Sequence, residues 1–258
     1  MILAIDAGNT NITIGVFDQN ELVGNFRMNT KIPRTSDEYG ILLSEILFQN
    51  GIDKKQIKDA IYASVVPAVN HSLISGIIKY FSVHPVIVKE SIKTGIRIAL
   101  DRPEQVGADR IVDAAGAYAL YGGPVIVIDF GTATTYDLVN GKGEFEAGLT
   151  APGVRISAKA LWEDAAKLPE IEIKKPKRIL AKETISSMQA GLVYGQIGQT
   201  EYIVKHMIEA SGYENVKVVA TGGLGNMISK ETDCIEEYNP NLTLIGLNIV
   251  YGLNQDES

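Results

Sequence analysis

Two short acidic turns in the sequence carry the residue types needed to hold phosphate groups. One spans Asp6 to Thr13 behind the apolar run Ile2 to Ile5, and the other spans Asp129 to Thr135 behind Val125 to Ile128. A carboxylate that ends a buried strand can hold a hydrated cation, glycine lets the backbone approach a ligand, and the hydroxyls and amides that follow suit phosphate oxygens. Two such turns facing each other would clamp the phosphates of a nucleotide.

A purely structural interpretation of these turns is also open. Asp, Gly and Asn populate the left-handed conformations of tight hairpin turns, so an Asp-x-Gly segment between two strands can be a turn and nothing more. Each copy has the pattern of strand, acidic turn and strand. The occurrence of two copies in one chain favours phosphate binding.

A third candidate lies between the two turns, at Gly107-Ala108-Asp109-Arg110. The segment is near the start of an expected helix, where free amides and the helix dipole favour anions. Asp109 could accept a proton from a substrate hydroxyl, and Arg110 could hold a carboxylate in a bidentate fork. The alternative is an acidic residue in the first turn of a helix, followed by a solvated arginine.

Length and composition limit the possible classes. A chain of 258 residues exceeds the usual size of a single core, and we expect two α/β lobes, at residues 1–103 and 104–258. The net charge of −7 argues against nucleic acid or an anionic membrane as the main partner. A single cysteine, Cys234, fits a cytoplasmic location, and the three scattered histidines do not suggest a metal site or a catalytic triad.

Alternating strand and helix patterns predict two α/β lobes related by duplication, with the site in the cleft between them. A capping box at Thr35 to Glu38 starts the first helix, Asn70 is expected to cap the second, and the connecting helix is expected over 104–121. A long helix is expected over 184–211 despite its three glycines, which suggests close packing against another element. The other expected strands are 21–29, 60–66, 85–88, 96–100, 144–150 and 216–220, and the other expected helices are 36–50, 71–81 and 154–168.

The order of the short motifs resembles that of the type III pantothenate kinases over the whole chain. The resemblance implies the actin-like, sugar-kinase-like ATPase fold, which is ribonuclease H-like. It also implies a homodimer that phosphorylates pantothenate with ATP, Mg²⁺ and a monovalent cation, K⁺ or NH₄⁺, in the first step of coenzyme A biosynthesis. The motifs are Asp6-x-Gly8-Asn9-Thr10, Gly107-Ala108-Asp109-Arg110, Asp129-x-Gly131-Thr132-Ala133-x-Thr135, Pro152-Gly153 and Thr221-Gly222-Gly223.

The resemblance also implies residue roles. Asp109 would be the general base, Asp6 would hold the water shell of the divalent ion, and Asp129 would bind the monovalent cation. Thr184 would reach pantothenate from the long helix, across the dimer interface. The ATP-binding residues would be Asp6, Ala7, Gly8, Asn9, Thr10, Asn11, Ile12, Thr13 and Thr132, and the pantothenate pocket would be lined by Gly107, Ala108, Asp109 and Arg110.

One position departs from the family pattern, because several members have a tyrosine where this chain has Leu100. A contact to pantothenate is therefore expected to be missing. Two other function classes compete with the kinase. A non-catalytic regulator could dispense with the base, yet Asp109 is present, and a polymerising or chaperone-type actin-like ATPase is usually larger than 258 residues.

Overall fold

The structure, a computed structural model, describes residues 1–89 and 91–255. The chain divides into two compact units. Unit 1 comprises Met1–Leu120 together with the C-terminal residues from Asn241 onward, and unit 2 comprises Tyr121–Pro240. The bounds of these units differ from those of the two lobes expected at residues 1–103 and 104–258. The expected lobes stay a prediction about the two halves of a duplication.

The sheet of unit 1 has five strands in the order β3-β2-β1-β4-β5. Strand β1 (Ile2–Ala7) pairs antiparallel with β2 (Asn11–Asp18) and parallel with β4 (Asp59–Ser64). The hairpin continues antiparallel into β3 (Glu21–Asn29), while β5 (Val86–Ile87) lies parallel to β4. The central strand β1 thus ends at the first acidic turn.

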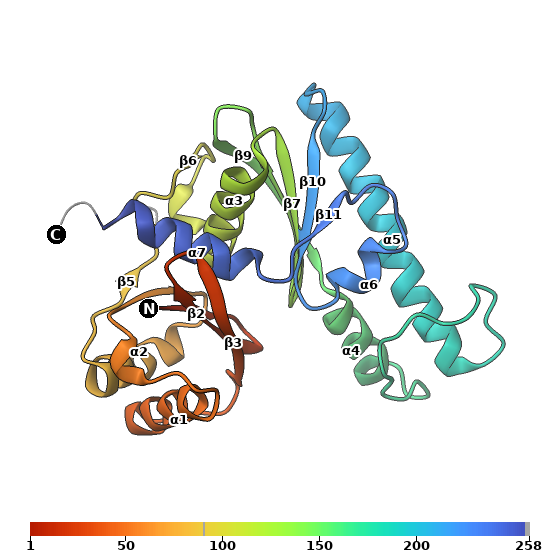
Figure 1. The fold of residues 1–258 in the computed structure, drawn as a ribbon. Coiled ribbons are helices and arrows are strands. Elements are labelled where there is room, and N and C mark those ends of the chain that lie inside the picture. The colour runs from red at the N-terminus through yellow and green to blue at the C-terminus, as the bar shows by residue number, and fades with distance from the viewer. Residues whose placement is uncertain (90, 256–258) are drawn as a thin grey trace. The chain divides into compact units, whose positions relative to one another are not determined.

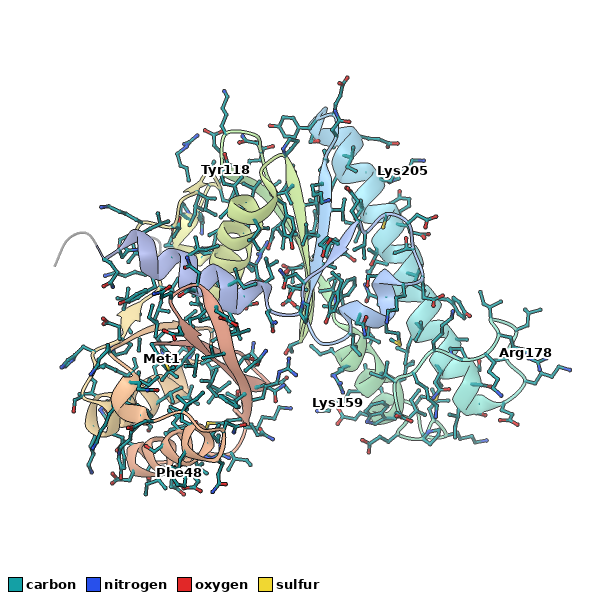
Figure 2. All side chains as sticks on the ribbon, viewed as in Figure 1. Met1, Phe48, Tyr118, Lys159, Arg178 and Lys205 are labelled. Carbon is teal, nitrogen blue, oxygen red and sulfur yellow. The ribbon has the colours of Figure 1, made fainter. Side chains whose placement is uncertain are left out.

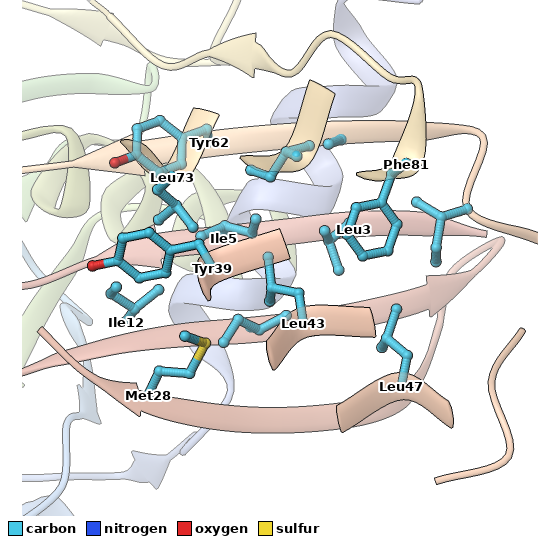
Figure 3. Close-up of a cluster of buried hydrophobic side chains, with 14 of the residues drawn as sticks. Leu3, Ile5, Ile12, Met28, Tyr39, Leu43, Leu47, Tyr62, Leu73 and Phe81 are labelled. Carbon is cyan, nitrogen blue, oxygen red and sulfur yellow. The ribbon is translucent and has the colours of Figure 1, made fainter. Parts of the chain in front are cut away.

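Helices cover both faces of this sheet (Figure 1). On one face, α1 (Ser36–Gln49) and α2 (Pro67–Phe81) pack on alternate residues of β1 and β4, and Figure 3 shows Leu3 and Ile5 among the side chains of Leu43 and Leu73. On the other face lie α3 (Ala108–Tyr121) and α7 (Leu242–Leu253). Because both faces are buried, β1 is apolar along nearly its whole length.

Helices α3 and α7 cross at two glycines. A Cβ atom on Gly116 would lie 3.0 Å from Gly246 Cα, and one on Gly246 would lie 2.1 Å from the Val112 carbonyl oxygen. No side chain fits at that distance, since non-bonded carbon atoms prefer about 3.5–4.0 Å. The crossing fixes α3, and with it the Gly107 to Arg110 segment, against α7.

The sheet of unit 2 repeats the topology of unit 1. Its strands are β7 (Val125–Phe130), β8 (Ala133–Val139), β9 (Glu144–Pro152), β10 (Lys217–Thr221) and β11 (Glu237–Tyr238). Their order within the unit is β9-β8-β7-β10-β11, with β7 antiparallel to β8 and parallel to β10. Both units thus have the strand order 3-2-1-4-5, which confirms the internal repeat predicted from the two acidic turns.

In unit 2, α5 (Thr184–Ser211) packs along one face of the sheet through Val193, Ile197 and Val204, and α6 (Gly225–Ser229) adds Ile228. Helix α4 (Val154–Asp164) packs against the first turns of α5, and Figure 2 marks Lys159 on α4 and Lys205 near the other end of α5. In the described part of the chain, no helix has both the length and the apolar character needed to cross a membrane. The remaining short elements are β6 (Arg97–Ile98) and the 3-10 turns Lys54–Gln56 and Pro103–Gln105.

Two expectations about elements are corrected, and one helix was not anticipated. Asn70 does not cap α2, because Pro67 occupies its first turn and the Asn70 side chain accepts hydrogen bonds from Tyr62 and Ser64 instead. Helix α3 begins at Ala108 and not at residue 104, since a separate 3-10 turn precedes it. Helix α7 was not anticipated, although its mostly apolar sequence is that of a buried helix.

Candidate active site

The first acidic turn is a tight hairpin held from a neighbouring strand. Asp6 is in register with Thr13 across β1 and β2, and the Gly8 N–H donates to the Asn11 carbonyl oxygen at 3.1 Å. Thr30, just after β3, clamps the turn from outside: its hydroxyl donates to the Gly8 carbonyl at 2.8 Å and its N–H donates to the Thr10 carbonyl at 3.1 Å. The turn is therefore rigid, while its tip, residues 9–11, is exposed.

Two of the predicted segments meet at Val65, directly after β4. The Val65 N–H donates to the Ala7 carbonyl at 3.1 Å, and a Cβ atom on Gly107 would lie 3.3 Å from Val65 Cγ1. Unit 1 therefore brings the acidic turn of Asp6 and the segment of Asp109 to either side of one residue. Sequence reasoning missed Val65 and Thr30, because neither belongs to a motif with recognisable spacing.

Asp109 lies in the first turn of α3, and its carboxylate is held in one orientation. Its Oδ1 accepts a hydrogen bond from the Arg110 N–H at 2.8 Å, and a Cβ atom on Gly107 would lie 2.4 Å from the same oxygen. A side chain at position 107 would therefore force this carboxylate to move. Burial raises the pKa of the Asp109 carboxyl, although the Arg110 N–H bond and the Arg110 charge oppose the shift.

Arg110 lines a mostly polar cavity of about 420 Å³ in unit 1. The cavity is open to solvent, and its wall includes Leu100, the position at which the resemblance described above predicts a tyrosine in several family members. Leu100, where a tyrosine contact to pantothenate is predicted to be missing, and Arg110, the arginine predicted to bind pantothenate, therefore line the same cavity. The lining residues are Leu100, Asp101, Arg102, Gln105, Val106 and Arg110.

The second acidic turn places Asp129 between two glycines. Asp129 is paired with Thr135 on β8 and with Thr221 on β10. A Cβ atom on Gly222 would lie 2.4 Å from Asp129 Oδ1, and one on Gly131 would lie 2.7 Å from Oδ2. The carboxylate thus occupies a cradle that any larger residue would fill, and Gly222 has a φ of +86°, which also favours glycine.

Thr132 follows on the same turn and is supported from behind by Gly153, the N-cap of α4. A Cβ atom on Gly153 would lie 2.2 Å from the Thr132 carbonyl oxygen and 2.7 Å from that of Gly131. The Pro152-Gly153 motif therefore has a packing role: it lets β9 turn into α4 directly against the acidic turn. Unit 2 brings Asp129, Thr132, Gly153 and Gly222 together.

Thr184 lies elsewhere in unit 2, at the first residue of α5. It is exposed and lines a cavity of about 690 Å³ together with Ser157 and Leu161 of α4. Asp129 and Thr132 are not among the described residues that line this cavity. The expected contact of Thr184 with pantothenate stays a prediction.

The two predicted metal sites differ from those of metal-cage proteins. Within residues 1–89 and 91–255, no three acidic, histidine or cysteine side chains converge on one point. Mg²⁺ in phosphoryl-transfer sites keeps several waters and is held by one or two carboxylates and the substrate phosphates, so a single Asp6 at the phosphate turn suits it. The Asp129 cradle, a carboxylate with backbone on both sides, suits a cation with oxygen ligands.

The repeated sheet and its two acidic turns define the class: the actin-like, sugar-kinase-like fold. Solved structures agree on this fold across nearly the whole chain. A protein described as a candidate Baf family transcriptional activator, from Campylobacter jejuni, has a TM-score of 0.59 and 16% identity and covers 98% of this chain and 99% of its own. A ROK family glucokinase from Streptomyces griseus, in complex with glucose and AMPPNP, has a TM-score of 0.50 and 12% identity, with 99% of each chain covered.

The sequence comparisons define the family within this class. The family model for type III pantothenate kinase matches residues 2–206. A type III pantothenate kinase from Agathobacter rectalis is 65% identical over 251 residues, which are 97% of this chain and 96% of the relative. The chain belongs to the type III pantothenate kinase family. It is a kinase that phosphorylates pantothenate for coenzyme A biosynthesis.

Proposed function

We propose that the protein transfers the γ-phosphoryl group of ATP to the hydroxyl of pantothenate with Asp109 as the general base, giving 4′-phosphopantothenate. The supporting observation is the Asp109 carboxylate, held in one orientation at the start of α3 and next to the Val65 contact with the acidic turn. Burial raises the pKa of this carboxyl and makes its ionised form a stronger proton acceptor. The test is ATP-dependent phosphorylation of pantothenate, measured with and without K⁺ or NH₄⁺.

The chain's own residues orient the reactants. Residues 6–13 hold the ATP phosphates at the rigid turn, and Thr132 contacts ATP from the second turn. Asp109 positions the acceptor hydroxyl and takes its proton late in a loose transition state, while Arg110 binds the carboxylate end of pantothenate. Mg²⁺, with its water shell held by Asp6, would neutralise charge that develops on the phosphate oxygens.

The monovalent cation is assigned to Asp129. If the carboxylate and its glycine cradle bind K⁺ or NH₄⁺, turnover should be low in sodium-only buffer and restored by potassium. Gly222→Ala is expected to weaken that activation, because the new Cβ would lie 2.4 Å from Asp129 Oδ1 and 2.6 Å from the Phe130 backbone nitrogen, so the carboxylate and its turn must shift. The measurement is the initial rate against K⁺ concentration for both proteins.

A matched control is Gly141→Ala in the β8–β9 hairpin, where the nearest atom would be 3.6 Å from the new Cβ. Its response to K⁺ should equal that of the unsubstituted protein. Equal rates in sodium-only and potassium buffers would remove the cation from Asp129.

We further propose a homodimer formed through α5. At 3.6 residues per turn, Thr184, Gly191, Gly195, Gly198 and Tyr202 fall within about 60° of one side of the helix. All five are exposed, and no atom of the described chain lies within 4 Å of a Cβ placed on any of the three glycines. The glycine side of α5 is therefore free to pack closely against a second copy of the chain. Such packing would also bring Thr184 to the pantothenate bound by the partner.

Gly195→Leu is expected to lower the sedimenting mass from twice the chain mass of 27.9 kDa to a single chain, because the added side chain separates the helices. Gly252→Leu, at another exposed helix glycine with no atom within 4 Å, should leave the mass unchanged. A monomeric unsubstituted protein with full activity would contradict both the interface and the shared role of Thr184. The proposed location is the cytoplasm, which the single cysteine supports.

A further inference from the structure

Two arginine side chains line the polar cavity near the start of α3. One belongs to Arg110, the arginine of the family motif, and the other belongs to Arg102, which is outside every motif discussed above. Arg110 follows Asp109 on α3, whereas Arg102 comes from the turn that precedes the helix. The two cations therefore reach one space of about 420 Å³ from different elements of unit 1.

The backbone of Arg102 is fixed. Arg102 is the N-cap of the 3-10 turn Pro103–Gln105, and its carbonyl oxygen accepts the Gln105 N–H at 3.1 Å. The next residue, Pro103, has its φ restricted by the ring and accepts the Val106 N–H at 3.2 Å. The turn thus fixes the backbone from which the Arg102 side chain extends.

The guanidinium of Arg102 has no side-chain partner among the described residues. Over the described residues it forms no hydrogen bond or ion pair with another side chain, although it is exposed and Asp101 is its neighbour in the cavity wall. An arginine without a side-chain partner, in the wall of a cavity that Arg110 also lines, is suited to an anionic ligand. Carboxylates are the usual partners of such paired donors.

We propose that Arg102 is a specificity-determining residue that binds the carboxylate of the acceptor together with Arg110. This assignment rests on the proposed function, in which the acceptor hydroxyl lies at Asp109 and the anionic end of the acceptor extends into the cavity. Leu100, in the same wall, supplies an apolar surface and no hydrogen-bond donor. The selection of an anionic acceptor therefore depends on the two arginines. Arg110 belongs to the family motif, and Arg102 adds a second positive charge from outside that motif.

The experiment compares two acceptors that differ only at this end: pantothenate, and pantothenol, in which a hydroxymethyl group replaces the carboxylate. For Arg102→Gln, we expect the KM for pantothenate to rise about tenfold, the loss of one charge-assisted hydrogen bond, with kcat within about twofold. The ratio of the two acceptors' kcat/KM values should fall by about the same factor. Arg102→Lys should recover part of the preference, because it keeps the charge but not the fork.

The control is Arg27→Gln, which removes one exposed positive charge from β3 of the same unit and should leave the ratio unchanged. A ratio unchanged in Arg102→Gln, or one lowered equally in Arg27→Gln, would overturn the inference and leave Arg102 a solvated surface charge. Binding of both compounds is measured in parallel by calorimetry. If the unsubstituted protein fails to phosphorylate pantothenate, the proposed function fails, while the change in binding ratio still decides the role of Arg102.

Discussion

Asp109→Asn is expected to reduce phosphorylation of pantothenate by roughly 10²- to 10⁴-fold, the usual contribution of general base catalysis. The amide keeps the shape of the side chain, and its oxygen can still accept the Arg110 N–H bond now made to Oδ1 at 2.8 Å. It loses the negative charge and with it the capacity to take a proton. The affinity for ATP should be unchanged, because the residues assigned to the phosphates are Asp6 to Thr13 and Thr132, and the measurement is steady-state kinetics with both substrates varied.

The same substitution has an expected effect on stability that depends on pH. Burial raises the folded-state pKa of the Asp109 carboxyl above its ordinary value of 3.8, so the native state binds more protons than the unfolded state between the two pKa values. The stability of the unsubstituted protein should therefore fall as pH rises through that window. Asp109→Asn has no titrating carboxyl at this position and should therefore have a higher melting temperature than the unsubstituted protein at neutral pH. The difference in melting temperature should vanish below the pKa of the carboxyl in the unfolded state.

The raised pKa also governs the unsubstituted enzyme. Asp109 must be ionised to accept a proton, so the acid limb of its kcat/KM profile should lie above pH 3.8. Asp53→Asn, at the exposed N-cap of the first 3-10 turn, is the matched control for the charge change and should retain full activity. Near-normal activity in Asp109→Asn would mean that Asp109 is a structural residue of the helix start.

The second large effect is expected for Gly153→Ala. The new Cβ would lie 2.2 Å from the Thr132 carbonyl and 2.7 Å from the Gly131 carbonyl, and both belong to backbone that cannot rotate away. Displacing this turn should cost about 1–3 kcal/mol of stability, as overpacking does, and raise the KM for ATP by moving Thr132. The backbone of Gly153, with a φ of −69°, is one that alanine adopts freely, so the effect isolates the steric clash.

Gly252→Ala provides the comparison, because this exposed helix glycine has no atom within 4 Å of the new Cβ. It should be neutral, or slightly stabilising through helix propensity. The measurements are thermal unfolding of both variants and the KM for ATP. A Gly153→Ala protein with unchanged ATP kinetics would show that Thr132 makes no contact that matters to the nucleotide.

The sequence predicted those parts of the protein whose place in the fold follows from the pattern of neighbouring residues. The acidic turns were recognisable because Asp6 and Asp129 each end an apolar strand, and the long helix because its apolar residues keep helical spacing. The capping box at Thr35 and Glu38 was also predicted and is present with both of its hydrogen bonds.

The missed features depend on contacts between residues far apart in the chain. Thr30 clamps the turn at Gly8 from the end of another strand, and Val65 links Ala7 to Gly107 across more than 40 positions of sequence. Asn70 was assigned to a helix cap because its type favours caps, yet Pro67 had already started the helix. The sequence motifs predicted the residues that could carry the chemistry of the site. The residues that hold these motifs in place are determined by tertiary packing and were not predicted.

The crossing of α3 and α7 has a consequence for the order in which the protein matures. Unit 2 is one continuous stretch and can fold as soon as it has been synthesised, whereas one face of the unit 1 sheet is buried in part by Leu244, Leu247 and Val250 of α7, which is translated after unit 2. Until then, the part of this apolar face that α7 covers stays exposed in the nascent chain. We therefore expect packing of the Asp109 segment to be completed only after α7 has been synthesised.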